Sequence, residues 1–231
     1  GQTGLSLDGR DFDGAGDPAR QVEVAMQNVK TLLADAGATI DDVCKVTTYL
    51  TDPAHRQQID AVLADHFEGV RPVVTSIHVN DLARPELDFE IDVFAIRSSE
   101  GSEHQRFQVP QVDGHSAWPQ SHAVRAGRFL FLQGQSGLRL DGSGLTGAGD
   151  VTAQAEQAME NVRTLLEEMG GRMEDICKVT TFVIDQAARL DVYPVFGRHL
   201  SGVNPASTGL VVEALWRPDL EVAIDAFAVI E

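Results

Sequence analysis

Acidic and apolar side chains alternate around residue 90, a pattern that offers acid–base chemistry. Asp88, Glu90 and Asp92 share one face of a predicted strand, and the other face carries Leu87, Phe89, Ile91 and Val93. A carboxylate buried by a neighbouring element has a raised pKa and can act as a general base or position a water molecule. Glu90 is therefore the candidate catalytic residue. The alternative is that all three carboxylates are solvated on an outer face.

The two cysteines and His122 could also do chemistry, but a structural role is favoured for each of them. Cys44 and Cys177 occur in the same segment, Cys-Lys-Val-Thr-Thr, and no base adjoins either of them. They are predicted to be one buried strand position that occurs twice, with free thiols and no disulfide. His122 could titrate near neutrality, but a structural role is favoured. No spacing typical of metal ligands and no cofactor motif is present, so neither a metal nor a cofactor is expected.

These residues belong to a tandem repeat. Residues 1–96 align with residues 134–229 without a gap, and nearly half of the aligned positions are identical. Residues 97–106 are polar and aperiodic, which is typical of a linker. The domains are therefore predicted as a first module at 1–96, the linker at 97–106 and a second module at 107–231. The segment 107–133 is predicted to add a pair of strands that has no counterpart before Gly1. Either the first module lacks them or a leading segment precedes Gly1.

Each module has the pattern strand, helix, strand, helix, strand, strand. Asp17 is predicted to cap the first helix and Gly37 to follow its end; Asp150 and Gly170 are their equivalents in the second copy. Pro194 is expected to make the last helix of the chain start late or bend. The predicted fold is α+β, with each mixed sheet packed against two helices on one face. The other face is left for water, a ligand or another subunit.

Composition and charge exclude several functional classes. The chain has 231 residues, 43% hydrophobic content and a net charge of -17. No apolar run approaches the roughly 18 residues of a membrane span, so no membrane association is expected. The negative surface repels phosphate backbones, which disfavours nucleic acid as a partner. The protein is expected in the cytoplasm, where the two thiols stay reduced.

The repeat resembles the Rid family of reactive-intermediate deaminases, also labelled L-PSP endoribonuclease-like. The resemblance rests on short segments in matching order: Pro119-Gln120-Ser121-His122-Ala123, Gly134-Gln135, Asp175-Ile176-Cys177-Lys178-Val179-Thr180 and Ile224-Asp225-Ala226-Phe227-Ala228. It implies chorismate-mutase-like modules that close into rings of three, with ligand pockets between modules. It also implies hydrolysis of imines or enamines to carbonyl compounds and ammonia.

The sequence departs from the site that this resemblance implies. The family uses an Arg for the substrate carboxylate, and the matching positions hold Val74 and Ser207. A Tyr and a Ser of the family match Gln120 and Gln133. Without the Arg, typical 2-imino acids should bind poorly, because two parallel charge-assisted hydrogen bonds are lost.

Two further positions decide how much of the chemistry remains. The water-positioning Glu of the family matches Glu90 in the first copy but Ala223 in the second. Arg71, three residues before Val74, is a possible substitute for the lost Arg, although an Arg beside a loop Pro is usually solvated. The substrate-binding candidates are thus Gln120, Gln133, Ser207, Val74 and Arg71.

Two functional hypotheses remain. The first is a divergent Rid-like hydrolase that acts on a small imine, enamine or related C–N compound. The second is a catalytically silent small-molecule-binding or assembly module. A ribonuclease, as the older label suggests, is disfavoured by the net charge of -17.

The module count predicts an oligomer. One chain supplies two modules, and the ring implied by the resemblance contains three. The smallest closed assembly therefore has three chains and six modules. Light scattering should give three times the chain mass of 25.0 kDa. A single-chain mass in dilute solution would contradict the trimer.

Overall fold

The computed structural model describes residues 1–98, 103–109 and 118–230. The first module contains β1 (Gln2–Thr3), α1 (Pro18–Asp35), β2 (Val43–Leu50), α2 (Arg56–His66), β3 (Val73–His78) and β4 (Phe89–Ala95). The second contains β5 (Gln105–Phe107), β6 (Ala123–Ala126), β7 (Phe129–Leu132), α3 (Val151–Glu168), β8 (Ile176–Val183), α4 (Arg189–His199), β9 (Ala206–Val211), β10 (Ala214–Leu215) and β11 (Val222–Val229). Strand β5 starts inside the predicted linker, and part of the segment 107–133, residues 110–117, lies outside the described residues.

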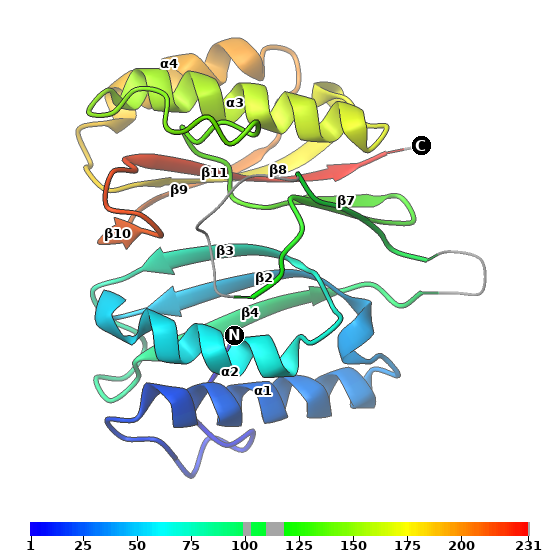
Figure 1. The fold of residues 1–231 in the computed structure, drawn as a ribbon, viewed down its shortest axis with the longest axis vertical. Helices are drawn as coiled ribbons and strands as arrows, with labels where there is room; N and C mark the ends of the chain where they lie inside the picture. Colours follow the sequence, from blue (N-terminus) through cyan, green and yellow to red (C-terminus); the bar gives the residue numbers. More distant parts are fainter. Residues whose placement is uncertain (99–102, 110–117, 231) are drawn as a thin grey trace.

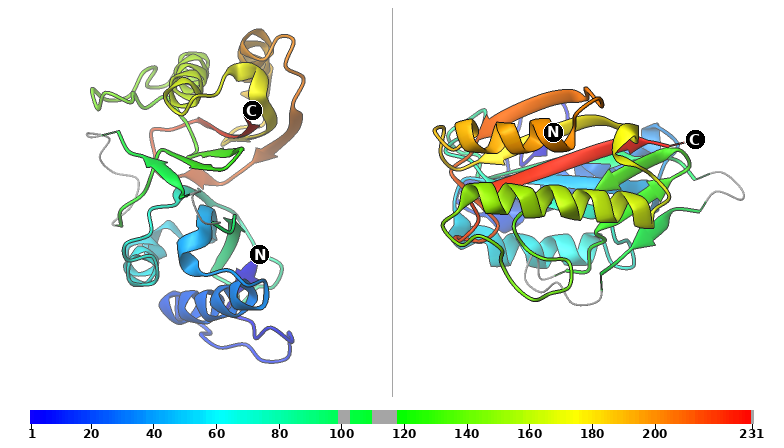
Figure 2. Two further views of the ribbon diagram at one scale, coloured as in Figure 1. Left: turned by 90° about the vertical axis from the view of Figure 1, so that its right-hand side faces the viewer. Right: turned by 90° about the horizontal axis from the view of Figure 1, so that it is seen from above.

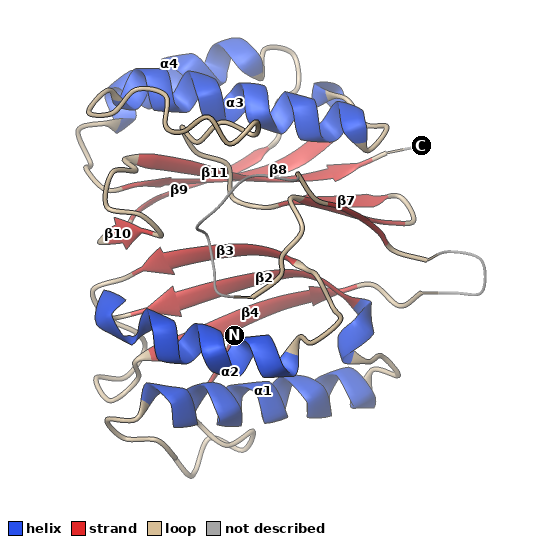
Figure 3. Ribbon diagram, viewed as in Figure 1, coloured by secondary structure: helices blue, strands red, loops and turns tan. Residues whose placement is uncertain are grey.

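Each module is a mixed sheet with its two helices on one face (Figure 1). β2 pairs in parallel with β3 and antiparallel with β4, and β8 pairs in the same two ways with β9 and β11. Figure 3 shows the helices outermost and the two sheets between them. This confirms the predicted α+β fold. The sheet faces that the helices leave free meet each other within one chain, as the side view also shows (Figure 2).

The helix ends follow the sequence signals. The Asp17 carboxylate accepts a hydrogen bond from the Arg20 backbone N–H at 3.1 Å, and the Asp150 carboxylate accepts one from Ala153 N–H at 3.0 Å. Each bond satisfies a backbone donor that the first helical turn leaves free. Gly37 follows the end of α1 with a φ of +69°, a conformation that glycine adopts without strain.

The last helix was predicted to start late or to bend at Pro194, and the late start is wrong. α4 begins at Arg189, which is the repeat equivalent of Arg56 at the start of α2, and it includes Pro194. Its core-facing residues Val192, Val195 and Phe196 are buried, so packing holds the helix in place around the proline. None of the helices in the described ranges combines the length and apolar content that crossing a bilayer requires.

Four apolar clusters fill the space between these layers. One lies between the helices and sheet of each module, and two lie between the sheets of different modules. The second module also extends the first module's sheet, because β10 pairs with β3 through Ala214 opposite His78. The two modules therefore share a core and a sheet.

A polar network lies at the contact between the modules. The Lys45 ammonium is 3.0 Å from an Asp225 carboxylate oxygen, and both side chains are nearly buried. The Thr75 hydroxyl donates to Asp225 at 2.6 Å and accepts hydrogen bonds from Lys45 and from the Gly134 backbone N–H. Lys45 also donates to the Leu132 carbonyl at 3.3 Å. Lys45 and Thr75 belong to the first module and the other three residues to the second, so this network fixes how the modules meet.

Removing one partner of this buried pair should destabilise the protein. Asp225→Ala is expected to lower the free energy of unfolding by about 3 kcal/mol, because it leaves a buried ammonium unpaired. Replacing both partners, Lys45→Met with Asp225→Leu, should recover most of that loss. Urea unfolding monitored by circular dichroism measures both effects.

Lys178→Met is the matched control for this comparison. Lys178 is the repeat equivalent of Lys45 but is exposed, so the change should stay within about 0.5 kcal/mol. Equal effects of Asp225→Ala and Lys178→Met would show that the ion pair does not hold the modules together.

Candidate functional site

A small cavity forms where β3 of the first module meets the second module. Ser121 pairs with Val73 beside the strand, and its backbone N–H donates to the Pro72 carbonyl at 3.0 Å. The cavity measures about 10 Å³, and the residues around it are Arg56, Val74, Ser76, Gln120, Gln133, Gly134 and Trp216. That volume suits about one water molecule. Three of the residues predicted for substrate binding, Val74, Gln120 and Gln133, thus lie together between the modules.

The two glutamines bond to each other in this cavity. The Gln133 side-chain amide donates to the Gln120 side-chain oxygen at 2.9 Å. The Gln120 side-chain nitrogen is buried and has no hydrogen-bond acceptor in the part of the chain that the structure describes. A buried donor of this kind favours a polar atom beside it, from a water molecule or a ligand.

The cation at this cavity is Arg56 and not Arg71. Arg71 is exposed and donates to the Gln108 side-chain oxygen at 3.1 Å, outside the cavity lining. Arg56 lines the cavity from the start of α2, and its guanidinium lies 3.4 Å from the Asp60 carboxylate. Arg56 was not among the predicted site residues. Its only signal is its recurrence as Arg189 in the second copy, which does not distinguish a helix-start residue from a ligand contact.

Glu90 lies on the face of β4 that is turned away from the helices. It is half-buried and pairs with Tyr49 of β2 and Thr3 of β1. Burial raises its pKa, and the neighbouring Asp92 carboxylate raises it as well. Glu90 does not line the small cavity. Its repeat equivalent, Ala223, is fully buried in the apolar cluster between the sheets.

Ser207 lies on a different edge of the molecule. It belongs to β9, whose six residues are all exposed, whereas its repeat equivalent Val74 belongs to β3, whose six residues are all buried. Within one chain the structure does not bring Ser207 and Glu90 together. β3 is covered by the second module, and β9 has no such cover among the described residues.

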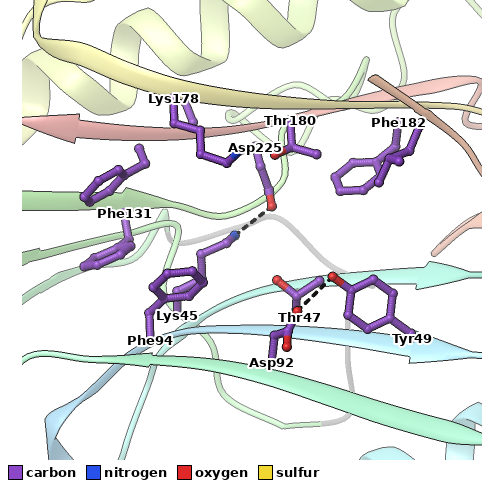
Figure 4. A pocket seen from close by; sticks show the side chains of 13 residues that line it. Lys45, Thr47, Tyr49, Asp92, Phe94, Phe131, Lys178, Thr180, Phe182 and Asp225 are labelled. Atoms are coloured by element: carbon purple, nitrogen blue, oxygen red, sulfur yellow. Dashed lines mark hydrogen bonds and ion pairs between the residues drawn. The ribbon is translucent and has the colours of Figure 1, made fainter. Parts of the chain in front are cut away.

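A larger cavity lies between the facing sheets and was not predicted. It measures about 310 Å³, and repeat-related pairs form much of its wall: Lys45 and Lys178, Thr47 and Thr180, Tyr49 and Phe182, Asp92 and Asp225, Phe94 and Phe227 (Figure 4). Phe131, Leu210 and Ala226 complete the lining. Lys45 and Thr47 are two residues apart on β2, so their side chains share a face. What that face meets depends on the other module.

His122 does not titrate near neutrality in this fold. Burial lowers its pKa to about 4, and its Nδ1 accepts a hydrogen bond from the Val109 backbone N–H at 3.1 Å. The ring is therefore neutral at physiological pH, which supports the structural interpretation. No group of three or more residues suited to holding a metal ion occurs within residues 1–98, 103–109 and 118–230.

Both cysteines are free thiols, as predicted, but the predicted burial is correct for Cys44 and wrong for Cys177. Cys44 is buried among Val73, Val124 and Phe131, whereas Cys177 is exposed. Burial raises the pKa of the Cys44 thiol to about 11. The two positions differ because the second module covers the first cysteine, and no equivalent cover lies over Cys177 in the described chain.

Two such modules, joined through facing sheets and a shared strand pairing, define a tandem Rid-fold protein. The chain belongs to the endoribonuclease L-PSP family, whose model matches residues 1–97 and 114–230. Protein DfrA of Myxococcus xanthus is 38% identical over 125 residues, which cover 53% of this chain and 90% of that protein. A mouse protein named 2-iminobutanoate/2-iminopropanoate deaminase is 32% identical over 111 residues, which cover 48% of this chain and 81% of that protein.

A solved structure resembles both modules together. A chorismatase superposes with a TM-score of 0.71 at 18% sequence identity, covering 99% of this chain and 73% of that one. At that identity the likeness shows the fold alone. It indicates that the side-by-side arrangement of the modules also occurs in another protein.

The repeat-related thiols should react differently with iodoacetamide. Cys177 is expected to be alkylated in the folded protein, while Cys44 should be modified only after unfolding, because burial blocks access and disfavours its thiolate. Peptide mass spectrometry before and after adding urea measures both sites. Equal labelling of the two thiols in the folded protein would contradict the burial difference.

Proposed function

We propose that this protein is a Rid-like hydrolase that releases ammonia from a small imine, enamine or related C–N compound. The observation that carries the proposal is Glu90, a half-buried carboxylate whose pKa is raised by burial, at the position where the family places its water-positioning Glu. Family membership and the mouse relative named as an imine deaminase support the same reaction class.

Glu90 would supply the proton transfers of this hydrolysis. Its carboxylate accepts a proton from water as the oxygen attacks the imine carbon, and this proton passes to the nitrogen to give a carbinolamine. Glu90 then takes the hydroxyl proton of the carbinolamine and delivers it to the nitrogen as the C–N bond breaks. The products are a carbonyl compound and ammonia. Because burial raises its pKa, Glu90 is a stronger base than an ordinary solvated carboxylate.

The substrate class follows from the residues that replace the family's Arg. Val74 and Ser207, which stand at the two matching positions, offer no charge to a carboxylate. A substrate without a carboxylate fits these surroundings better than a typical 2-imino acid.

The repeat suggests which residues of another copy could complete the site around Glu90. Within the chain, Val74 of β3 lines the same small cavity as Gly134 of the second module. Ser207 is equivalent to Val74, and Gly1 is equivalent to Gly134. Gly1 lies directly beside Glu90, because a Cβ built on Gly1 would clash with the Glu90 carboxylate. The same contact between two copies would therefore place Ser207 of one copy beside Glu90 of the next. We propose a homo-oligomer, with three chains as the expected number, whose ligand binds at this module interface.

The second candidate function is a catalytically silent binding or assembly module. It is favoured by the contact inside the chain, where the cavity holds about one water molecule and Ala223 replaces the catalytic carboxylate. An ammonia-release assay over a panel of imines, generated in solution with and without a carboxylate, distinguishes the two functions. Ammonia release faster than the uncatalysed rate supports the hydrolase.

Substitution of Glu90 tests the catalytic assignment. Glu90→Gln should lower the rate of ammonia release by roughly 100-fold or more, since general-base contributions have that size, and should leave the circular dichroism spectrum unchanged. Ala223→Glu, at the repeat-equivalent position, should add no activity because Ala223 is buried in the apolar cluster between the sheets and the matching site also lacks the family's Arg. Unchanged turnover in Glu90→Gln would favour the binding module.

A further inference from the structure

A second small cavity lies inside the second module, beside the one at Val74. It measures about 10 Å³ and is lined by His122, Gln133, Gly134, Gln135, Ser136, Leu138 and Leu140. Gln133 and Gly134 border both small cavities. Every residue of this lining belongs to the second module, so its walls include neither the first module nor another copy of the chain.

One edge of the His122 ring has no hydrogen-bond partner at this cavity. His122 is 8% exposed, and its Nδ1 accepts a hydrogen bond from the Val109 backbone N–H at 3.1 Å. Because burial keeps the ring neutral, its one N–H hydrogen lies on the other nitrogen, Nε2. Nε2 is buried and has no acceptor among the residues that the structure describes. A buried N–H group in a native fold is nearly always bonded to protein or to ordered water.

Two further side chains supply polar atoms to the same cavity. The Ser136 hydroxyl oxygen accepts a hydrogen bond from the Leu138 backbone N–H at 3.3 Å, which leaves its O–H to donate. The Gln135 amide nitrogen donates to the Gln133 carbonyl at 2.8 Å, which leaves the side-chain oxygen of Gln135 to accept. Ser136 and Gln135 are 2% and 4% exposed, so these groups are almost closed off from bulk water.

We propose that this cavity is a binding site for one buried water molecule, which His122 holds in place. The water oxygen accepts hydrogen bonds from His122 Nε2 and from the Ser136 hydroxyl, and one water hydrogen is donated to the Gln135 side-chain oxygen. A volume of about 10 Å³ suits a single water molecule. No charged side chain lines the cavity, so a small ion would be buried without a counter-charge.

The bound water gives His122 a defined role in the fold. Val109 follows strand β5, and Ser136 belongs to the segment between β7 and α3. His122 bonds to the first directly and to the second through the water. The water therefore joins the added strands of the second module to the part that the repeat shares. His122 has no repeat equivalent within the chain, so this site is specific to the second module.

A high-resolution crystal structure of the full chain tests this proposal. The expected result is a single electron-density peak within about 3.2 Å of His122 Nε2, the range of N–H···O hydrogen bonds. Crystals soaked in sodium bromide distinguish water from an anion, since bromide gives an anomalous signal. An empty cavity, or a bromide peak within it, would overturn the proposal.

Variants identify the residues that hold the water. His122→Leu removes the donor, and the peak should disappear from its crystal structure. Ser136→Ala leaves His122 in place and should lower the occupancy of the peak. Ser143→Ala is the matched control in an exposed turn and should leave the peak unchanged. A peak of full occupancy in His122→Leu or in Ser136→Ala would contradict the assigned hydrogen bonds.

Urea unfolding tests the same bonds in solution. The urea midpoint of His122→Leu combined with Ser136→Ala should fall by less than the sum of the two single shifts, because either change alone already breaks the bonds to the water. His122→Leu combined with Ser143→Ala should be additive. Additivity of both pairs would overturn the shared water. Neither measurement involves Glu90, so the outcome is independent of whether the protein is a hydrolase.

Discussion

The buried contact between Lys45, Thr75 and Asp225 determines how the two modules meet. An ion pair taken out of water stabilises a structure only when the remaining polar atoms are also bonded, and here one hydroxyl and two backbone groups complete the set. Apolar clusters adjoin this network between the sheets. The clusters bury apolar surface, while the polar groups can form their hydrogen bonds in only one alignment of the two sheets. The small cavity and the larger one both depend on that alignment.

Duplication has placed the same residues in different surroundings. Lys45 is buried and paired, whereas Lys178 is exposed. The same contrast holds for the two cysteines and for strands β3 and β9. In each case the first copy is covered by the second, and the second is left open among the described residues. The open copy is therefore the one whose side chains are available for ligands or for another subunit.

Patterns within one module could be predicted, and relations between modules could not. The caps at Asp17 and Asp150 and the apolar face with Phe89 and Ile91 follow from local rules, because backbone donors and apolar side chains must be satisfied nearby. The family resemblance pointed to Val74, Gln120 and Gln133, which do lie together.

Arg56, the larger cavity and the exposure of Cys177 were missed for one physical reason. Each depends on which surface of one module covers which surface of the other, and side-chain periodicity carries no information about that contact. Pro194 is a different case, in which packing of α4 prevails over the local preference of the residue.

The strand pairing between β3 and β10 has a consequence for the order of folding. The sheet of the first module is completed by Ala214 and Leu215, more than a hundred residues further along the chain. During synthesis the first module emerges early, but β3 keeps an unpaired edge until nearly the whole chain has been made. Contacts so distant in sequence form slowly, because the closure of a long loop precedes the gain from pairing. During synthesis, the first half of the chain is thus the part most exposed to strand exchange with another nascent chain.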